Sequence, residues 1–203
     1  MCGIAGFAGI ELPADETKRR LQVMCDAILH RGPDCDGRFI AKGVAMGMRR
    51  LSIIDVAGGD QPISNEDGTV TVVFNGEIYN HHQLRRELVA AGHHFATRSD
   101  TEVLVHLYEE RGTDMVRRLK GMFAFSIWDS RRQQLFLARD RTGMKPLSYA
   151  LRGSGIVYCS ELRALYASFF YGAGGVCGPQ SIFFSPSGSP ALRRSSTIRA
   201  YSR

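Results

Sequence analysis

The sequence contains no apolar run long enough to cross a membrane and no closely spaced pair of cysteines. A membrane-spanning helix needs about 18 consecutive apolar residues, and no stretch of the chain approaches that length. The first residues show no basic segment followed by an apolar run, so we expect no secretory signal. The five cysteines form no Cys-x-x-Cys pair, which argues against a zinc site of that kind and against a disulfide framework. We therefore expect a cytoplasmic protein with no membrane partner.

Histidine patterns that bind metals are missing as well. None of the six histidines stands in a His-Glu-x-x-His arrangement. Of the two adjacent pairs, His81-His82 lies between Asn80 and Gln83, and His93-His94 follows Gly92. We therefore expect these side chains at the surface or at helix ends, and we expect no metal site.

Acidic residues are absent from the last 36 residues of the chain. This segment holds four arginines, so most of the formal net charge of +6 belongs to it and the remainder of the chain is nearly neutral. We therefore expect no nucleic-acid partner. Residues 167–203 are rich in Ser, Gly, Pro and Arg and lack periodicity, which predicts a disordered tail after a single domain formed by residues 2–166.

Apolar periodicity predicts strands mainly toward both ends of this domain, with helices grouped between them. Strands are expected at residues 2–9, 45–54, 69–75, 122–129, 135–139, 147–151 and 156–160. Helices are expected at residues 16–30, 82–91 and 101–111, and a last one begins at 162. This order favours an α+β layered sandwich over a parallel α/β sheet.

Cys2 is the most informative residue. Removal of Met1 would give it a free N-terminus, so that a thiol and an α-amino group belong to one residue. An α-amino group titrates only slightly above neutral pH and can accept the proton of a thiol, so Cys2 could serve as a nucleophile with its own base. An early cysteine can equally be a small buried hydrophobic residue, so the rest of the sequence decides between the two.

Two segments offer groups for the charged ends of an amino acid. Arg50 begins an apolar run, and its guanidinium could pair with a carboxylate, although an arginine at a strand edge can be a plain surface residue. Asp100 lies inside a capping-box pattern formed by Ser99 and Glu102. Its carboxylate could pair with an ammonium group, or it could only complement the helix dipole.

A third segment offers donors for an oxyanion. The Asn75 side-chain amide and the Gly76 backbone N–H stand next to each other at the end of the predicted strand 69–75. The alternative is an Asn-Gly tight turn without a catalytic role. A further polar turn, residues 30–34, could cover a pocket. Nucleophile, carboxylate partner, ammonium partner and oxyanion donors together suit an amino acid amide, and glutamine meets every demand.

Six motifs in one order then resemble a known family. They read Met-Cys-Gly-Ile-Ala-Gly, His-Arg-Gly-Pro-Asp, Arg-Arg-Leu-Ser-Ile-Ile-Asp, Phe-Asn-Gly-Glu-Ile-Tyr-Asn, Ser-Asp-Thr-Glu-Val and Ala-Arg-Asp-Arg-Thr-Gly-Met-Lys-Pro-Leu. Over residues 2–166 the chain resembles the glutaminase domain of glutamine-hydrolysing asparagine synthetase, a class II glutamine amidotransferase. His-Arg-Gly-Pro-Asp favours this branch over the purine and glucosamine-phosphate amidotransferases.

The resemblance implies a four-layer αββα sandwich of the N-terminal-nucleophile type. It also implies that Cys2 is the nucleophile and that Asn75 and Gly76 form the oxyanion hole. The residues that it implies in glutamine binding are Arg50, Ile53, Ile54, Asn75, Gly76, Glu77 and Asp100. The expected reaction is hydrolysis of L-glutamine to glutamate and ammonia through a thioester on Cys2.

The chain also departs from the family pattern. Met48, Thr142 and Ser148 differ from it, but none of these changes removes a proposed catalytic group. No Ser-Gly-Gly-x-Asp-Ser loop occurs, so we expect no synthetase domain in this chain and no cofactor, because ATP and Mg²⁺ serve that domain. A separate synthetase domain or a second copy could be a partner. The alternatives are a catalytically silent binding or regulatory module and a non-functional truncated product.

Overall fold

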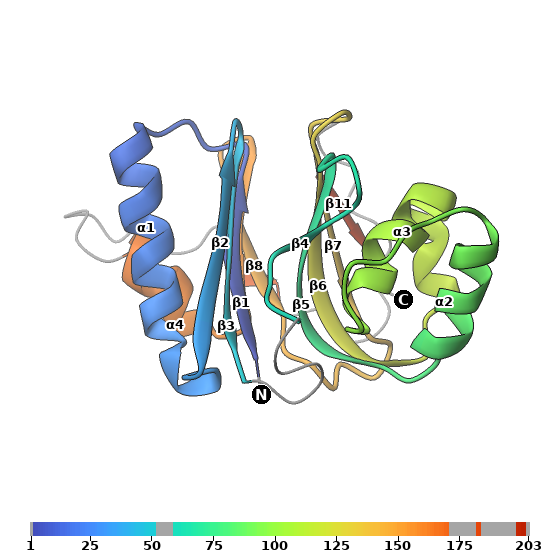
Figure 1. Ribbon diagram of the computed structural model, residues 1–203. Coiled ribbons are helices and arrows are strands. Elements are labelled where there is room, and N and C mark those ends of the chain that lie inside the picture. Colours follow the sequence, from blue (N-terminus) through green and yellow to red (C-terminus); the bar gives the residue numbers. More distant parts are fainter. Residues whose placement is uncertain (1, 52–58, 171–181, 184–197, 202–203) are drawn as a thin grey trace.

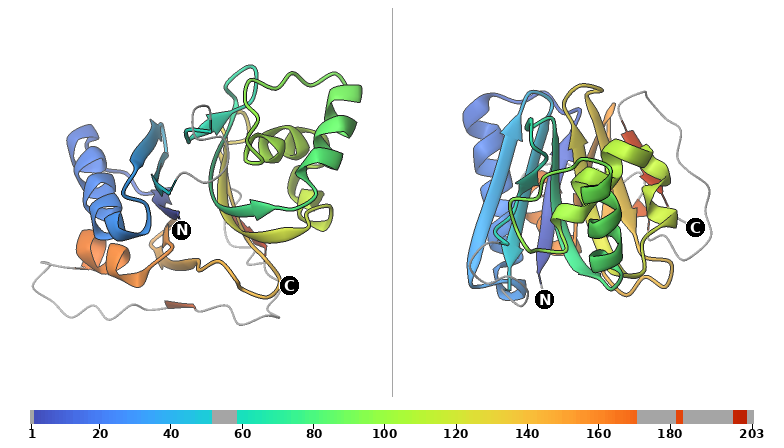
Figure 2. Two further views of the ribbon diagram at one scale, coloured as in Figure 1. Left: turned by 60° about the horizontal axis from the view of Figure 1, so that its bottom comes forward. Right: turned by 45° about the vertical axis from the view of Figure 1, so that its right-hand side comes forward.

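The computed structural model describes residues 2–51, 59–170, 182–183 and 198–201. These residues form four layers, in the order helices, sheet, sheet and helices (Figure 1). The two further views in Figure 2 show the same arrangement, with each pair of helices on the outer face of its own sheet. The predicted α+β four-layer sandwich is therefore confirmed. Within these ranges, no helix combines the length and the apolar character needed to cross a bilayer.

The first sheet is antiparallel and carries the N-terminal strand near its middle. Its strand order is β10-β8-β9-β1-β3-β2. The strands are β1 (Gly3–Ala8), β2 (Cys35–Ala41), β3 (Val44–Arg50), β8 (Ser148–Arg152), β9 (Gly155–Cys159) and β10 (Ile182–Phe183). The helices α1 (Ala14–Ala27) and α4 (Leu162–Leu165) cover its outer face, together with a 3₁₀ turn at Leu29–Arg31 and a π-helical turn at Tyr166–Phe170.

The second sheet has the strand order β11-β7-β6-β5-β4. Its strands are β4 (Ile63–Ser64), β5 (Val70–Ile78), β6 (Gly121–Asp129), β7 (Gln134–Arg139) and β11 (Ile198–Tyr201). All neighbours are antiparallel except β11, which runs parallel to β7. The helices α2 (His81–Ala90) and α3 (Glu102–Arg111) and a 3₁₀ turn at Gly112–Arg117 cover its outer face.

Both faces of each sheet are buried, which explains why the central strands read as continuous apolar runs. Successive side chains of a strand point to opposite faces. Accordingly Val72 and Phe74 pack toward α2 and α3, whereas Val73 packs between the two sheets. The layer between the sheets also contains Trp128 and Tyr158. Packing of both faces fixes the register of β5 and thereby the positions of the polar residues at its end.

Several predicted boundaries differ from those in the structure. The strand expected at 45–54 ends at Arg50, and residues 52–58 lie outside the described residues. The strand expected to end at Asn75 continues to Ile78. In the predicted tail the structure has the short strands β10 and β11, and the rest of 171–203 lies outside the described residues. The disorder expected for residues 167–203 stays a prediction.

Candidate functional site

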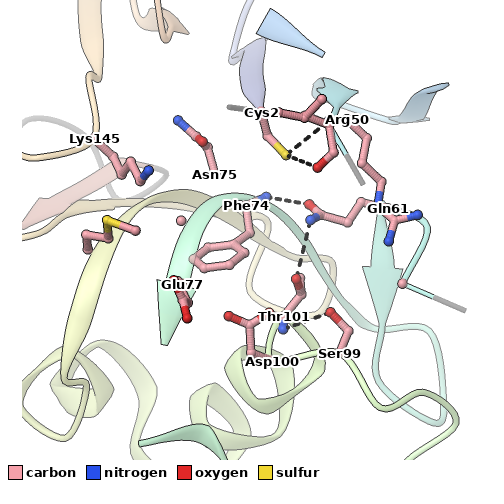
Figure 3. A pocket seen from close by; sticks show the side chains of 14 residues that line it. Cys2, Arg50, Gln61, Phe74, Asn75, Glu77, Ser99, Asp100, Thr101 and Lys145 are labelled. Atoms are coloured by element: carbon pink, nitrogen blue, oxygen red, sulfur yellow. Dashed lines mark hydrogen bonds between the residues drawn. The ribbon is translucent and has the colours of Figure 1, made fainter. Parts of the chain in front are cut away.

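A cavity of about 590 Å³, counting the space that is open to solvent, lies where the two sheets and the start of α3 meet (Figure 3). Six of the predicted site residues line it: Cys2, Arg50, Asn75, Gly76, Glu77 and Asp100. They come from the first sheet, from β5 and from the residues that precede α3. The structure therefore brings together groups that lie far apart in the sequence. Ile53 and Ile54, also predicted here, lie outside the described residues.

Cys2 stands directly before β1 and is held by backbone contacts. The N–H of Leu51 donates to its sulfur at 3.4 Å, and the thiol lies 3.6 Å from the Leu51 carbonyl oxygen. On the other side, Arg31 Nε donates to the Cys2 carbonyl oxygen at 3.0 Å, and Arg31 also pairs with Glu161 at 3.0 Å. These contacts hold a half-buried thiol at the cavity wall.

Arg50 ends β3 and lines the same cavity. Its side chain is only 5% exposed, and Nη1 donates to the carboxylate of Asp60 at 2.7 Å. Asp60 is itself a surface residue, with 75% of its side chain exposed. The guanidinium is therefore fixed where solvent screens its charge only weakly. A cation in this position can bind the carboxylate of a ligand that enters the cavity.

Asp100 supplies the opposite charge. Its side chain is buried, and Oδ2 accepts a hydrogen bond from the N–H of Ile78 at 2.9 Å. Burial raises the pKa of Asp100, although the Ile78 N–H and nearby His81 oppose this shift. Among the described residues, the groups that act on this buried carboxylate include no Lys or Arg, so it would gain from a cationic ligand. An ammonium group next to Asp100 would provide that charge.

The capping box predicted for this segment is wrong in its details. Ser99 Oγ accepts the N–H of Thr101 at 3.2 Å, and α3 starts at Glu102 without a side-chain cap at Thr101. The Glu102 carboxylate does not return to Ser99 but accepts the N–H groups of Ala96 and Thr97 at 2.7 Å each. Glu102 therefore stabilises the loop before the helix. That loop positions Asp100 beside the cavity.

Asn75 and Gly76 lie inside β5, opposite Ala124 and Phe123 of β6. The alternative of a tight turn is therefore wrong. A Cβ atom at Gly76 would lie only 2.2 Å from the carbonyl oxygen of Met122, so the close approach of β6 requires glycine here. Asn75 is 1% exposed, and its Nδ2 has no hydrogen-bond partner among the described residues. Such a buried donor costs roughly 1–3 kcal/mol, which is best explained by a ligand that accepts its hydrogen bond.

The structure adds cavity residues to which sequence reasoning gave no role. Gln61 joins β5 to the start of α3, because its Oε1 accepts the N–H of Phe74 at 2.7 Å and its Nε2 donates to Thr101 Oγ1 at 3.3 Å. No motif marked Gln61 in the sequence. Lys145 is buried and lies on the far side of Asn75 from Cys2 in Figure 3. It belongs to a quoted motif, so the resemblance could have pointed to it.

Asp140 of the same motif holds the loop that carries Lys145. Its Oδ2 accepts the N–H groups of Lys145 at 3.0 Å and Phe123 at 3.2 Å, and its Oδ1 accepts the N–H of Met144 at 2.9 Å. Burial acts to raise the pKa of Asp140, but these backbone donors outweigh it and lower the pKa. The charged Asp140 thereby fixes the Lys145 backbone next to β6.

Comparison with known proteins gives consistent results. Residues 1–173 match the family described as the glutamine amidotransferase domain. The chain is 44% identical over 169 residues to "Asparagine synthetase [glutamine-hydrolyzing] 2" of Bacillus subtilis, which covers 82% of this chain and 22% of that protein. It is 42% identical over 167 residues to "Asparagine synthetase [glutamine-hydrolyzing] 3" of Arabidopsis thaliana, with 81% and 28% covered. The chain thus spans less than a third of the length of either relative.

Solved structures share the fold. The glutamine phosphoribosylpyrophosphate amidotransferase of B. subtilis, solved with ADP and GMP, superposes with a TM-score of 0.66 at 26% identity. The match covers 82% of this chain and 43% of that one. A second structure, described as the allosteric regulatory enzyme of purine biosynthesis, gives a TM-score of 0.67 at the same identity. The four layers described above are therefore those of the N-terminal-nucleophile amidotransferases.

Proposed function

Because the chain belongs to the glutamine amidotransferase domain family, we propose that it hydrolyses L-glutamine to glutamate and ammonia through a γ-glutamyl thioester on Cys2. The α-amino group of Cys2, freed by removal of Met1, takes the thiol proton, and the sulfur attacks the side-chain carbonyl carbon. The C–N bond then breaks, and the amide nitrogen leaves as ammonia with the proton from the amine. Water next attacks the thioester, glutamate leaves, and the thiol is restored.

One observation carries this proposal: the buried Nδ2 of Asn75 without a hydrogen-bond partner in the described part of the chain, at a cavity that Cys2 also lines. The carbonyl oxygen of glutamine becomes an oxyanion only during attack. Donors fixed before the reaction stabilise such a charge without reorganisation. We assign this role to Asn75 Nδ2 and the N–H of Gly76.

The two buried charges support glutamine as the substrate. Arg50 is proposed to bind the α-carboxylate, and Asp100 is proposed to bind the α-ammonium group. Glu77 lines the cavity next to Gly76 and belongs to the proposed binding segment. Ile53 and Ile54 are proposed to continue this segment. The proposed reaction needs no cofactor, since every group in it belongs to Cys2, to the backbone, to Asn75 or to water.

The experiment pairs a catalytic variant with an oxyanion variant. Cys2→Ala should abolish glutamine hydrolysis, because no thioester can form. Asn75→Ala should lower kcat by roughly 10²–10³ and change KM much less, since the lost hydrogen bond strengthens only in the transition state. Release of glutamate and ammonia measures turnover, and intact mass spectrometry reports whether Met1 has been removed. A glutamine-like alkylator of the thiol counts the competent sites.

Cys35→Ala is the matched control, because Cys35 is another half-buried thiol that does not line the cavity. It should keep both turnover and alkylation by the substrate analogue. Retained hydrolysis in Cys2→Ala would refute the mechanism. A wild-type protein that is folded and has lost Met1 but neither turns over glutamine nor reacts with the alkylator would favour a silent binding or regulatory module, or a non-functional truncated product.

We also propose a partner that would use the ammonia and a cellular compartment for the protein. The relatives are asparagine synthetases by name, so a separate synthetase domain or a second copy of this chain is the partner that we propose to test. Co-purification of the chain with such a domain, and glutaminase rates with and without it, would test this. The cytoplasm is proposed as its compartment, and the four described cysteines, which are all free thiols, agree with reducing conditions.

A further inference from the structure

A second group of polar side chains lies in the helix layer of the second sheet. Glu66 comes from the turn between β4 and β5, His93 from the loop after α2, and His106 and Glu109 from α3. One nitrogen or oxygen atom from each of the four lies within 4.8 Å of those of the others. None of the four belongs to the described residues that line the cavity of Cys2. We call these residues the His93–His106 cluster.

The distances inside the cluster are close to those between ligands of a metal ion. His106 Nδ1 lies 3.4 Å from Glu66 Oε2 and 3.4 Å from Glu109 Oε2. His93 Nδ1 lies 3.7 Å from Glu66 Oε1 and 3.8 Å from Glu109 Oε2. A tetrahedral ion with bonds of about 2.1 Å separates its ligands by about 3.4 Å. Ordinary N–H···O hydrogen bonds are shorter, at roughly 2.7–3.2 Å.

The outer contacts of the two histidines resemble those of metal-bound imidazoles, with a hydrogen bond at His93 and a longer contact at His106. Both rings direct Nδ1 toward the centre of the cluster and Nε2 toward another carboxylate. His93 Nε2 lies 3.2 Å from Glu110 Oε1, and His106 Nε2 lies 3.7 Å from Glu102 Oε1. Histidine ligands of metals almost always donate the N–H of their second nitrogen to a carboxylate, a carbonyl or water, which fixes the ring orientation.

The two glutamates are oriented in the same manner. Glu109 Oε1 accepts a hydrogen bond from Asn65 Nδ2 at 2.8 Å, which leaves Oε2 facing both histidines. Glu66 Oε1 accepts the N–H of His94 at 2.9 Å. His93, Glu66 and Glu109 are thus each oriented by a hydrogen bond with a residue outside the cluster.

The burial of His106 and the negative charge around the cluster both favour binding of a cation. His106 is 1% exposed, and within the described residues neither of its ring nitrogens has a hydrogen-bond partner. Four carboxylates, those of Glu66, Glu102, Glu109 and Glu110, surround the two imidazoles. None of the ion pairs within the described ranges joins these carboxylates to a Lys or an Arg. A dication would both satisfy the nitrogen of His106 and offset the negative charge.

We propose that Glu66, His93, His106 and Glu109 bind one divalent transition-metal ion, and that Zn²⁺ fits this ligand set best. Two imidazole nitrogens and two carboxylate oxygens suit zinc, whereas Mg²⁺ and Ca²⁺ prefer oxygen ligands alone. All four positions are filled by protein, so the ion is structural. It links the β4–β5 turn and the loop after α2 to α3. The sequence predicts no metal site at these histidines. The proposed ligands come from separate segments of the chain and form no sequence motif that would mark them.

The test uses the full chain without an affinity tag, stripped of metal by a chelator and titrated with Zn²⁺ by calorimetry. The measurements are made in a Cys2→Ala background, because an N-terminal cysteine can itself bind zinc. We expect one Zn²⁺ per chain and a melting temperature that rises with the Zn²⁺ concentration. His93→Gln and Glu109→Gln should each remove the bound ion and the rise in melting temperature. Far-UV circular dichroism verifies that each variant is folded.

His94→Gln is the matched control. Its side chain is adjacent in sequence to a proposed ligand but is not part of the cluster, so this variant should bind one Zn²⁺ like its parent. Co²⁺ should bind in place of Zn²⁺ and give the visible absorption of a tetrahedral nitrogen–oxygen site. The proposal is overturned if the parent binds no ion, or if binding persists in both His93→Gln and Glu109→Gln.

Discussion

Arg50 and Asp100 bring opposite charges to one cavity from different layers of the molecule. Both side chains are buried, and burial of an ionised group is costly. The raised pKa of Asp100 is a direct sign of this cost, because burial disfavours its charged form. A residue whose charge destabilises the fold needs another role, and the proposed ammonium ligand would supply it.

The stability and the substrate binding of Asp100→Asn should therefore change in opposite directions. Folding raises the pKa of Asp100, so the folded state holds this proton more tightly than the unfolded chain does. The free energy of unfolding is therefore highest below pH 3.8, the ordinary pKa of this carboxyl group. It falls as pH rises from there through the raised pKa of the folded state, and above that pKa the loss is complete. Asparagine avoids this loss and keeps an oxygen for the Ile78 N–H.

We expect Asp100→Asn to melt at a higher temperature than the wild type at pH 7, and the difference to shrink as pH falls through the acidic range. The KM for glutamine should rise strongly, because loss of a desolvated charged partner costs on the order of 2–5 kcal/mol. Thermal melts over a pH series and steady-state kinetics measure both effects. An unchanged KM would leave Asp100 with only a structural role, and a difference in melting temperature that does not vary with pH would contradict the titration argument.

At the scale of elements, the sequence predicted most strands and helices, since buried strands such as β6 and β7 are mostly apolar. It did not predict β2. This edge strand alternates between partly buried and exposed positions and carries Asp36 and Arg38. Charged residues on edge strands oppose aggregation, but they also weaken the apolar pattern that marks a strand. Motifs and resemblance named six residues that line the cavity, whereas Gln61 is marked only by contacts made in the folded chain.

Asn75 and Gly76 show why local sequence preferences did not predict the backbone conformation at the site. The pair is typical of a tight turn, yet both faces of β5 are covered, and its pairing with β6 continues through both residues. Tertiary contacts thus overrode the local preference. The glycine is needed because the backbone of β6 approaches closely, not because the chain turns.

Gly76→Ala should therefore disturb a strand pair and the site together. The added Cβ would lie 2.2 Å from the Met122 carbonyl oxygen and 2.7 Å from Phe123 Cα, both backbone atoms. We expect a lower melting temperature and a large loss of kcat, because β5 must shift and carries Asn75 with it. Gly68→Ala is the control: it has a φ of +70° and no atom within 4 Å of the added Cβ. It should cost about 1 kcal/mol of stability and leave kcat unchanged per titrated site. Normal turnover by folded Gly76→Ala would contradict this account.

At the scale of the whole molecule, the site depends on how the two sheets pack. Cys2 directly precedes β1 of the first sheet and Arg50 ends β3 of the same sheet, whereas Asn75 and Gly76 belong to the second. Neither sheet carries the proposed nucleophile and the proposed oxyanion donors together. The layer between the sheets therefore sets the distance between them. It is apolar apart from a few groups, among them Ser126 of β6 and Tyr158 of β9.

Ser126 Oγ and the Tyr158 hydroxyl form a 2.7 Å hydrogen bond between the sheets, and both residues are fully buried. Burial strongly raises the pKa of Tyr158, so the hydroxyl is neutral at pH 7. Ser126→Ala leaves this hydroxyl without its partner and should lower the free energy of unfolding by about 1–3 kcal/mol. Tyr158→Phe should cost a similar amount. The double variant should cost less than the two single costs combined, because it leaves neither group unpaired. Urea unfolding of the wild type and the three variants measures this coupling. Strictly additive costs would show that the hydrogen bond does not help to hold the two sheets in register. In that case it would not help to fix the positions of Cys2 and Asn75 either.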